Sequence, residues 1–320
     1  MLRSITLPQV GAVAVGHQFR CERLASGHVL VTGHELAESR LLDPSFAVAE
    51  PVGGDSRAVA AIHVGVDRVA TSIGGELRLR TRAGAEKLRT SGRGRQRAYR
   101  FTSNGVWLWE LARRRRWVAR LRRVEDGKIA AEAALPEADP TLGAWSLVSE
   151  HPLINAVIAK SVDRHVAIEH RPDGALEVRP LALDVFIDWL PDGRSFLAAT
   201  FDGRLTVHRW PGDTVLRTVA TERLADLFVD QLGLHGRVID DDRALLDTLG
   251  GRLMVVDLVD PTAEVIEVRL TGDARPLGLS WLELGRSGRI LTGRAGDDLL
   301  RVWDGTAVLR SIPSRAAGLR

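Results

Sequence analysis

Short apolar runs separated by polar turns recur along the whole chain and predict strands. The segment 185–220 shows the pattern in one unit: apolar strands at Val185–Leu190, Ser195–Thr200, Leu205–Trp210 and Thr214–Ala220. Pro191-Asp192-Gly193 and Asp202-Gly203 supply the turns between them. The second strand has the continuous apolar pattern of a strand buried on both faces, and the third, which alternates, is expected nearer the rim.

The same four-strand unit repeats with a period of about 40 to 47 residues. The third strand of each unit is the clearest marker. These strands are expected near 39–43, 76–81, 117–122, 165–170, 204–209, 252–257 and 299–304. Seven units fill the chain, so the sequence predicts an all-β fold, a β-propeller with seven blades of four antiparallel strands, and a single domain over residues 1–320.

The best preserved copy runs from Leu291 to Gly305 and ends in Trp303-Asp304. In this ending the chain resembles the WD-repeat family of propellers, in which such a unit forms a blade. The resemblance implies a protein-interaction scaffold, and a turn aspartate in each blade: Asp297 or Asp298 in the last unit, with Asp202 and Asp163 in similar places. The family's Gly-His dipeptide is replaced by Gly272-Asp273, so its hydrogen-bonded network is expected to be incomplete.

Two segments compete to close the ring. Either Ser4–Val10 or Ala307–Ile312 supplies the outer strand of the last blade, and the tetrapeptide Leu-Arg-Ser-Ile occurs at both places, at residues 2–5 and 309–312. The C-terminal segment is preferred because it lies next to the last unit in the chain. The N-terminal segment is then expected to pair alongside it or to lead into the first blade.

Composition points to a soluble cytoplasmic protein without a prosthetic group. No apolar run approaches the roughly 18 to 20 residues that cross a bilayer, and the first residues do not resemble a secretion signal, so no membrane insertion is expected. Cys21 is the single cysteine, which excludes an intrachain disulfide and a cysteine-based zinc site. Common nucleotide-binding and hydrolase motifs are absent from the sequence, so we expect no cofactor and favour a non-catalytic role.

Histidine and aspartate clusters suggest metal ligands but do not have suitable geometry. A strand period of two places His165 and His170 on opposite faces, so the pair is not expected to share an ion. Asp240-Asp241-Asp242 is expected to form a solvated turn. No metal site is predicted.

Charge is concentrated in one segment. Between Arg78 and Arg123 there are sixteen basic residues against two acidic ones, whereas the whole chain carries +3. Two groups fall in connections of the third unit that should emerge on the same face of the disc. The candidate binding residues are Arg93, Arg95, Arg97, Arg113, Arg114, Arg115 and Arg116. Tyr99, Trp107, Trp109 and Trp117 lie close to them in sequence, and the tryptophans are interpreted as blade core.

Three functions remain open from the sequence. The first is a scaffold or adaptor subunit of a cytoplasmic bacterial assembly that binds protein partners with acidic surfaces through the arginine-rich face. The second is a lyase or hydrolase with a site in the central channel, which requires buried titratable groups there. The third is binding of nucleic acid or another anionic ligand through the same arginines. A solvated basic loop, enlarged by arginine-rich coding bias, is the alternative without a function.

Overall fold

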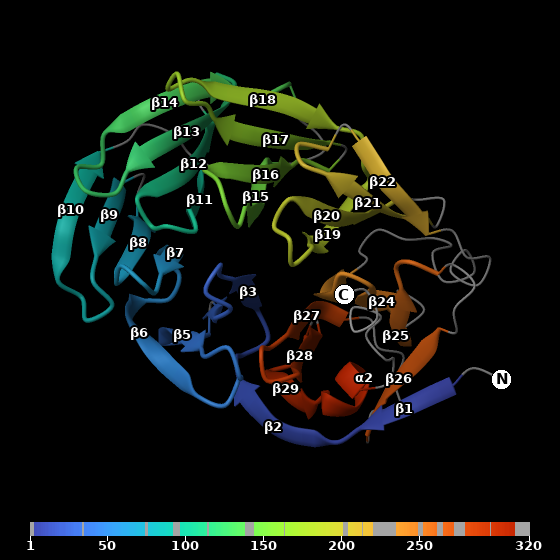
Figure 1. Ribbon diagram of the computed structural model, residues 1–320. Helices are drawn as coiled ribbons and strands as arrows, with labels where there is room; N and C mark the ends of the chain where they lie inside the picture. Colours follow the sequence, from blue (N-terminus) through green and yellow to red (C-terminus); the bar gives the residue numbers. More distant parts are fainter. Residues whose placement is uncertain are drawn as a thin grey trace.

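Seven sheets stand around a central axis, with the innermost strands facing it (Figure 1). The structure is a computed structural model. It describes residues 3–33, 35–73, 76–91, 97–113, 115–137, 144–162, 164–200, 204–212, 214–219, 235–248, 252–260, 265–271, 279–294 and 296–310. These residues form the seven-bladed β-propeller that the repeat predicts, with four antiparallel strands in each blade.

The strands of a blade are numbered outward from the axis. Blade 1 contains β3 (Phe19–Arg23), β4 (Val29–Gly33), β5 (Glu38–Leu42) and β6 (Ala49–Asp55). Blade 2 contains β7 (Val59–His63), β8 (Arg68–Ile73), β9 (Glu76–Arg80) and β10 (Glu86–Ser91). Blade 3 contains β11 (Arg97–Phe101), β12 (Trp107–Arg113), β13 (Trp117–Arg123) and β14 (Ile129–Ala134).

The later blades follow the same order. Blade 4 contains β15 (Ser146–Glu150), β16 (Ala156–Lys160), β17 (His165–His170) and β18 (Leu176–Leu181). Blade 5 contains β19 (Val185–Trp189), β20 (Ser195–Ala199), β21 (Leu205–Arg209) and β22 (Thr214–Val219). Blade 6 contains β23 (His235–Asp240), β24 (Arg243–Thr248), β25 (Arg252–Asp257) and β26 (Ile266–Leu270). Blade 7 contains β27 (Leu279–Leu284), β28 (Arg289–Arg294) and β29 (Leu299–Asp304), with α2 (Thr306–Arg310) after it.

Burial follows the position of a strand in its blade. Every residue of β20 is buried, and β21 is buried along all but its last residue. The third strand of blade 5 lies nearer the rim than the second, as the sequence predicts, and it is almost as buried. Neighbouring sheets still cover both faces at this radius. Exposure begins at the fourth strand, and most of β22 is open to solvent.

The N-terminal segment closes the ring, so the preference for the C-terminal segment was wrong. β2 (Gln9–Ala14) pairs antiparallel with β29 as the outer strand of blade 7. β1 (Arg3–Leu7) pairs in parallel with β26 and gives blade 6 a fifth strand. The chain after β29 turns into α2, because Asp304 accepts hydrogen bonds from the backbone and hydroxyl of Thr306 and caps that helix. The edge of β29 is then free to take β2.

Blade 7 keeps part of the bonding that its Trp-Asp ending suggests. The buried indole of Trp303 donates a hydrogen bond of 2.8 Å to the hydroxyl of Thr292 on β28. Asp297 accepts from Arg301 at 2.6 Å and so braces the turn before β29. Asp163, Asp202 and Gly272-Asp273 lie outside the described residues.

One carboxyl group is buried between blades 6 and 7. Asp247 on β24 is 0% exposed, and its Oδ2 accepts a hydrogen bond of 3.2 Å from the Leu279 backbone. Its Oδ1 has no hydrogen-bond partner among the described residues. Burial raises the pKa of Asp247 to about 7, although the Leu279 N–H and Arg294 oppose the change.

Candidate functional site

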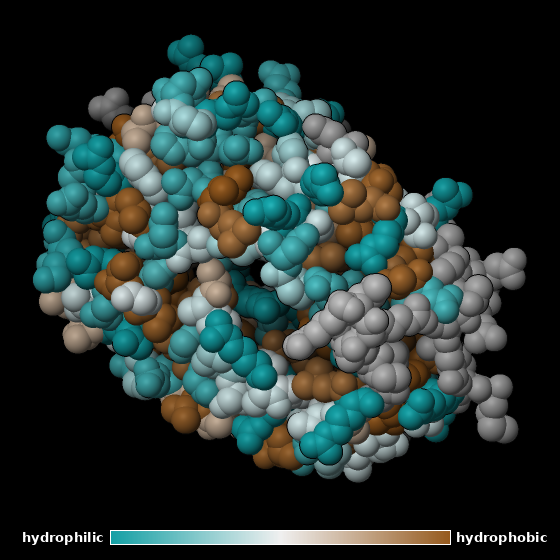
Figure 2. Space-filling view, viewed as in Figure 1, coloured by the Kyte–Doolittle hydropathy of each residue, from teal (hydrophilic) through white to brown (hydrophobic). Residues whose placement is uncertain are grey.

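A cavity lined by both polar and apolar residues occupies the central channel. Its volume is about 1370 Å³, and the innermost strands and adjoining turns of the blades line it. Figure 2 shows a hollow at the centre of the disc with both hydrophilic and hydrophobic residues around it. A cavity of this size at the axis is large enough for a small molecule or an inserted peptide segment.

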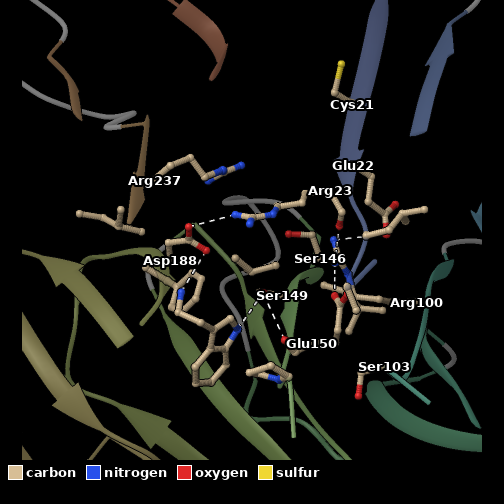
Figure 3. A pocket seen from close by; sticks show the side chains of 18 of the residues that line it. Cys21, Glu22, Arg23, Arg100, Ser103, Ser146, Ser149, Glu150, Asp188 and Arg237 are labelled. Carbon is tan, nitrogen blue, oxygen red and sulfur yellow. Dashed lines mark hydrogen bonds and ion pairs between the residues drawn. The ribbon is translucent and has the colours of Figure 1, made fainter. Parts of the chain in front are cut away.

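Charged side chains of the innermost strands reach across this channel (Figure 3). Arg23 of blade 1 pairs with Asp188 of blade 5 at 3.1 Å and with Glu283 of blade 7 at 3.3 Å. Arg237 of blade 6 binds the same Glu283 at 2.9 Å. Blades 1 and 5 are not neighbours in the ring, so the Arg23–Asp188 pair is a direct bond between opposite sides.

A second set is centred on Arg100 of blade 3. Its guanidinium pairs with Glu22 of blade 1 at 3.3 Å and donates a short hydrogen bond to Glu150 of blade 4. Burial opposes the charged form of Arg100, yet Glu150 and Glu22 together raise its pKa above the ordinary value. Burial raises the pKa of Glu22, and Arg100 counteracts it.

We call these residues the channel belt. It consists of Glu22, Arg23, Arg100, Glu150, Asp188, Arg237 and Glu283. Each carboxylate of the belt is bound by an arginine, so the belt holds six blades at fixed positions around the axis. The sequence analysis did not find it. The available signal was a charged residue at the third position or later in six of the seven innermost strands.

Two neutral histidines also line the channel. Burial is the main reason that the pKa of His165 is lowered to about 4, and the nearby Lys160 ammonium lowers it further. Burial, Arg237 and Lys160 lower the pKa of His235 to about 4 as well. The channel therefore contains buried groups with displaced pKa values, as the channel-site hypothesis requires, alongside carboxylates that are held in ion pairs.

Much of the basic segment is neutralised by contacts that the sequence does not show. Arg100 belongs to the channel belt. Arg120 and Arg122 of β13 flank the fully buried Glu110 of β12, with Arg120 at 3.6 Å, and Arg120 also pairs with Glu132. The local charge of the folded protein is thus smaller than the count along the chain indicates.

Other arginines of the segment are paired at the surface of blade 2. Arg78 and Arg89 share Glu76, and Arg82 reaches Glu50 and Asp67. Exposed pairs of this kind contribute little stability, but they lower the positive potential of this side of the disc.

Arg113, Arg115 and Arg116 are exposed and make no ion pair with a described residue, and we call them the arginine cluster. Arg89 and Arg123 are exposed too, but each pairs with a carboxylate. Arg113 ends β12 opposite Trp117, and Arg97 begins β11 opposite Ala112. Arg97 and the cluster are therefore at the same end of blade 3, as the antiparallel connections predict. Arg93, Arg95 and Arg114, as well as the side chain of Arg97, lie outside the described residues.

The aromatic residues near the cluster are mainly core. Trp109, Trp117 and Tyr99 are buried, which agrees with the sequence interpretation of the tryptophans. Trp107 is partly exposed, and it lies under the Arg123 guanidinium at 5.9 Å and beside the His170 ring. No stacking platform is formed by these residues beside the arginine cluster.

The described residues contain no group of three or more His, Cys, Asp or Glu arranged to hold a metal ion. His165 faces the channel cavity, whereas His170 contacts Trp107. Asp240 pairs with Arg243 within its turn. Across the same described residues, no helix has the length and apolar character needed to cross a membrane.

Comparison with known proteins shows a fold but no family. A scan against protein families finds no match, and a search of curated proteins finds none either. Among solved structures, BamB from Moraxella catarrhalis is similar, with a TM-score of 0.54 and 11% identity over 93% of this chain and 99% of that one. The class that fold and comparison define is the seven-bladed β-propeller. With 1319 matching chains, the fold is too widely shared to assign a function.

Proposed function

We propose that this protein is a non-catalytic interaction scaffold in a cytoplasmic bacterial assembly, and that its arginine cluster binds an acidic surface of a protein partner. The observation that carries the proposal is a contrast within one segment. Seven other arginines of the segment pair with carboxylates: Arg78, Arg82, Arg89, Arg100, Arg120, Arg122 and Arg123. Arg113, Arg115 and Arg116, in contrast, are exposed and make no ion pair with the described residues, and Arg80, which also has no ion pair with them, is partly buried.

The cluster has the geometry of a recognition site for carboxylates. Guanidinium groups donate to carboxylates in a bidentate manner, which gives orientation as well as attraction. Strands β12 and β13 are buried up to the turn that carries the cluster, so this turn stands on a rigid support. A rigid base lowers the entropy lost when a partner binds.

The ion-paired channel belt supports a structural role for the axis. Its carboxylates are engaged by Arg23, Arg100 and Arg237, and bonds between non-adjacent blades keep the disc from distorting. We also propose kinship with WD-repeat propellers. The Trp303–Thr292 hydrogen bond supports this kinship in the last blade.

The test is a triple variant, Arg113→Ala with Arg115→Ala and Arg116→Ala. Its control removes the same charge from exposed positions elsewhere, Lys128→Ala with Arg194→Ala and Arg209→Ala. Tagged wild-type and variant proteins are used to capture partners from cell extract, and the affinity for each captured protein is then measured with purified components.

The proposal expects a partner that binds wild type and control equally and the triple variant at least tenfold more weakly, with a loss that shrinks at high salt. Equal binding of the triple variant would contradict it. A fluorescent oligonucleotide is measured in parallel. If affinity for nucleic acid falls steeply with salt and depends on the cluster while no protein is captured, the binding surface is retained but the protein partner is rejected.

A further inference from the structure

Among the described residues of the channel cavity the acceptor carboxylates are already paired, whereas several hydrogen-bond donors are not. The carboxylates that line it are Glu22, Glu150, Asp184 and Asp188. The belt arginines bind Glu22, Glu150 and Asp188, and Asp184 also has an interaction partner. Among the described lining residues, carboxylate groups are therefore already engaged.

Donors from four blades are not engaged. Arg20 of blade 1 and Lys160 of blade 4 line the cavity and make no ion pair with a described residue. The His235 ring of blade 6 has no hydrogen bond to the described part of the chain. The Trp281 Nε1 of blade 7 is buried without a partner, although the Arg237 guanidinium lies 5.6 Å from its ring.

Unpartnered donors around a cavity favour a ligand that brings acceptor oxygens. A buried indole N–H without an acceptor is unfavourable, and a bound oxygen would satisfy it. Arg20 and Lys160, which lack an ion pair with the described residues, add attraction for negative charge from the same lining. Both side chains are exposed, so this attraction is strongest at low ionic strength.

The geometry points to an oxyanion-binding site in the central channel, for a ligand with at least two carboxylate or phosphate groups. Two groups are needed because the donors stand on blades 1, 4, 6 and 7, and one small anion does not contact opposite walls of a cavity of about 1370 Å³. Arg20 and Lys160 supply charge, while His235 and Trp281 supply directed N–H groups. The site does not involve the arginine cluster, so it stands or fails independently of the proposed protein partner.

The experiment is isothermal titration calorimetry of the whole protein at low ionic strength. The probes are citrate and pyrophosphate as small ligands, and hexaglutamate as an acidic peptide. The variants are Lys160→Ala and His235→Ala, and Lys128→Ala is the matched control because it removes an exposed lysine that does not line the channel. Thermal unfolding of each variant reports whether the fold is kept.

We expect at least one probe to bind with one-to-one stoichiometry. Lys160→Ala should weaken it about tenfold, which corresponds to about 1.4 kcal/mol, and Lys128→Ala should leave it unchanged. Binding of citrate or pyrophosphate alone identifies a small-molecule ligand, and binding of hexaglutamate alone identifies an acidic protein segment. Either result supports the site.

The inference would be overturned if no probe bound at millimolar concentration, or if Lys160→Ala and Lys128→Ala weakened binding equally. If His235→Ala unfolds, Trp281→Phe replaces it, since it removes the unpartnered N–H with little change in volume. The change in tryptophan fluorescence on binding is then compared between wild type and Trp281→Phe. A difference shows that the ligand reaches the wall of the cavity formed by Trp281. A probe that binds without any such difference also counts against the site.

Discussion

Replacing Asp247 by asparagine should make the stability of the propeller less dependent on pH. In the unfolded chain this carboxyl ionises near pH 3.8, and in the folded protein near pH 7. The folded state binds the proton more tightly, so this group's contribution is complete below about pH 4 and is lost as the pH rises to 7. A difference of about 3 pH units corresponds to about 4 kcal/mol at most.

Asparagine cannot ionise, and its side-chain oxygen can still accept the Leu279 hydrogen bond. Asp247→Asn should therefore match wild type near pH 4 and exceed it above pH 7 by up to about 4 kcal/mol. The buried His165 and His235 are uncharged in the folded protein down to about pH 4, so they destabilise it in acid. This effect is the same in wild type and in Asp247→Asn, and it cancels when the two are compared.

Urea unfolding followed by tryptophan fluorescence at several pH values between 4 and 8 measures this difference. The control is Asp241→Asn, which removes an exposed carboxylate from the turn that leads into the same strand. A difference between Asp247→Asn and wild type that does not change with pH would refute the reasoning. So would an equal trend for Asp241→Asn.

Three further predictions concern the blades and their closure. Glu110→Gln removes the counter-charge of two buried guanidinium groups and should cost about 3 to 5 kcal/mol in urea unfolding, whereas the same change at the half-exposed Glu132 should cost about 1 kcal/mol or less. In a double-mutant cycle of Trp303→Phe and Thr292→Val, coupling of about 1 kcal/mol should appear, and additive effects would show that the hydrogen bond is unimportant. Removal of residues 1–7 should leave a protein that is folded by circular dichroism, because β1 is mostly exposed. Removal of residues 1–14 also deletes β2 and should cause aggregation, seen by size-exclusion chromatography. Equal behaviour of the two truncations would argue against closure by β2.

The fold was largely predictable because its signal is local and repeated. In the unit at 185–220, strand limits agree with the structure to within a residue, since apolar runs and Asp-Gly turns specify them directly. Closure was not predictable in the same way. The sequence offered Ser4–Val10 and Ala307–Ile312 as candidates, whereas the closing strand is Gln9–Ala14. The hydrogen bonds that Asp304 accepts from Thr306 start a helix at the C-terminal candidate.

The candidate site was predictable only in part. The turn position of Arg115 and Arg116 follows from the strand pattern. The neutralisation of Arg100 and Arg120 does not, because Glu22, Glu150 and Glu132 come from other strands and the sequence contains no information on which charges meet. Burial of Glu110 is equally hidden, since an isolated acidic residue in a strand is ordinarily expected to face solvent.

Closure by β2 also determines when the ring can form during synthesis. Gln9 is made before the seven blades, and its partner Trp303 follows 294 residues later. At ribosomal rates of about 5 to 20 residues per second, β2 waits for about 15 to 60 s before its partner strand exists. During that interval the earlier blades are an open arc with unpaired edges. We therefore expect chaperones to shield the unpaired edges of the nascent chain until its last blade emerges.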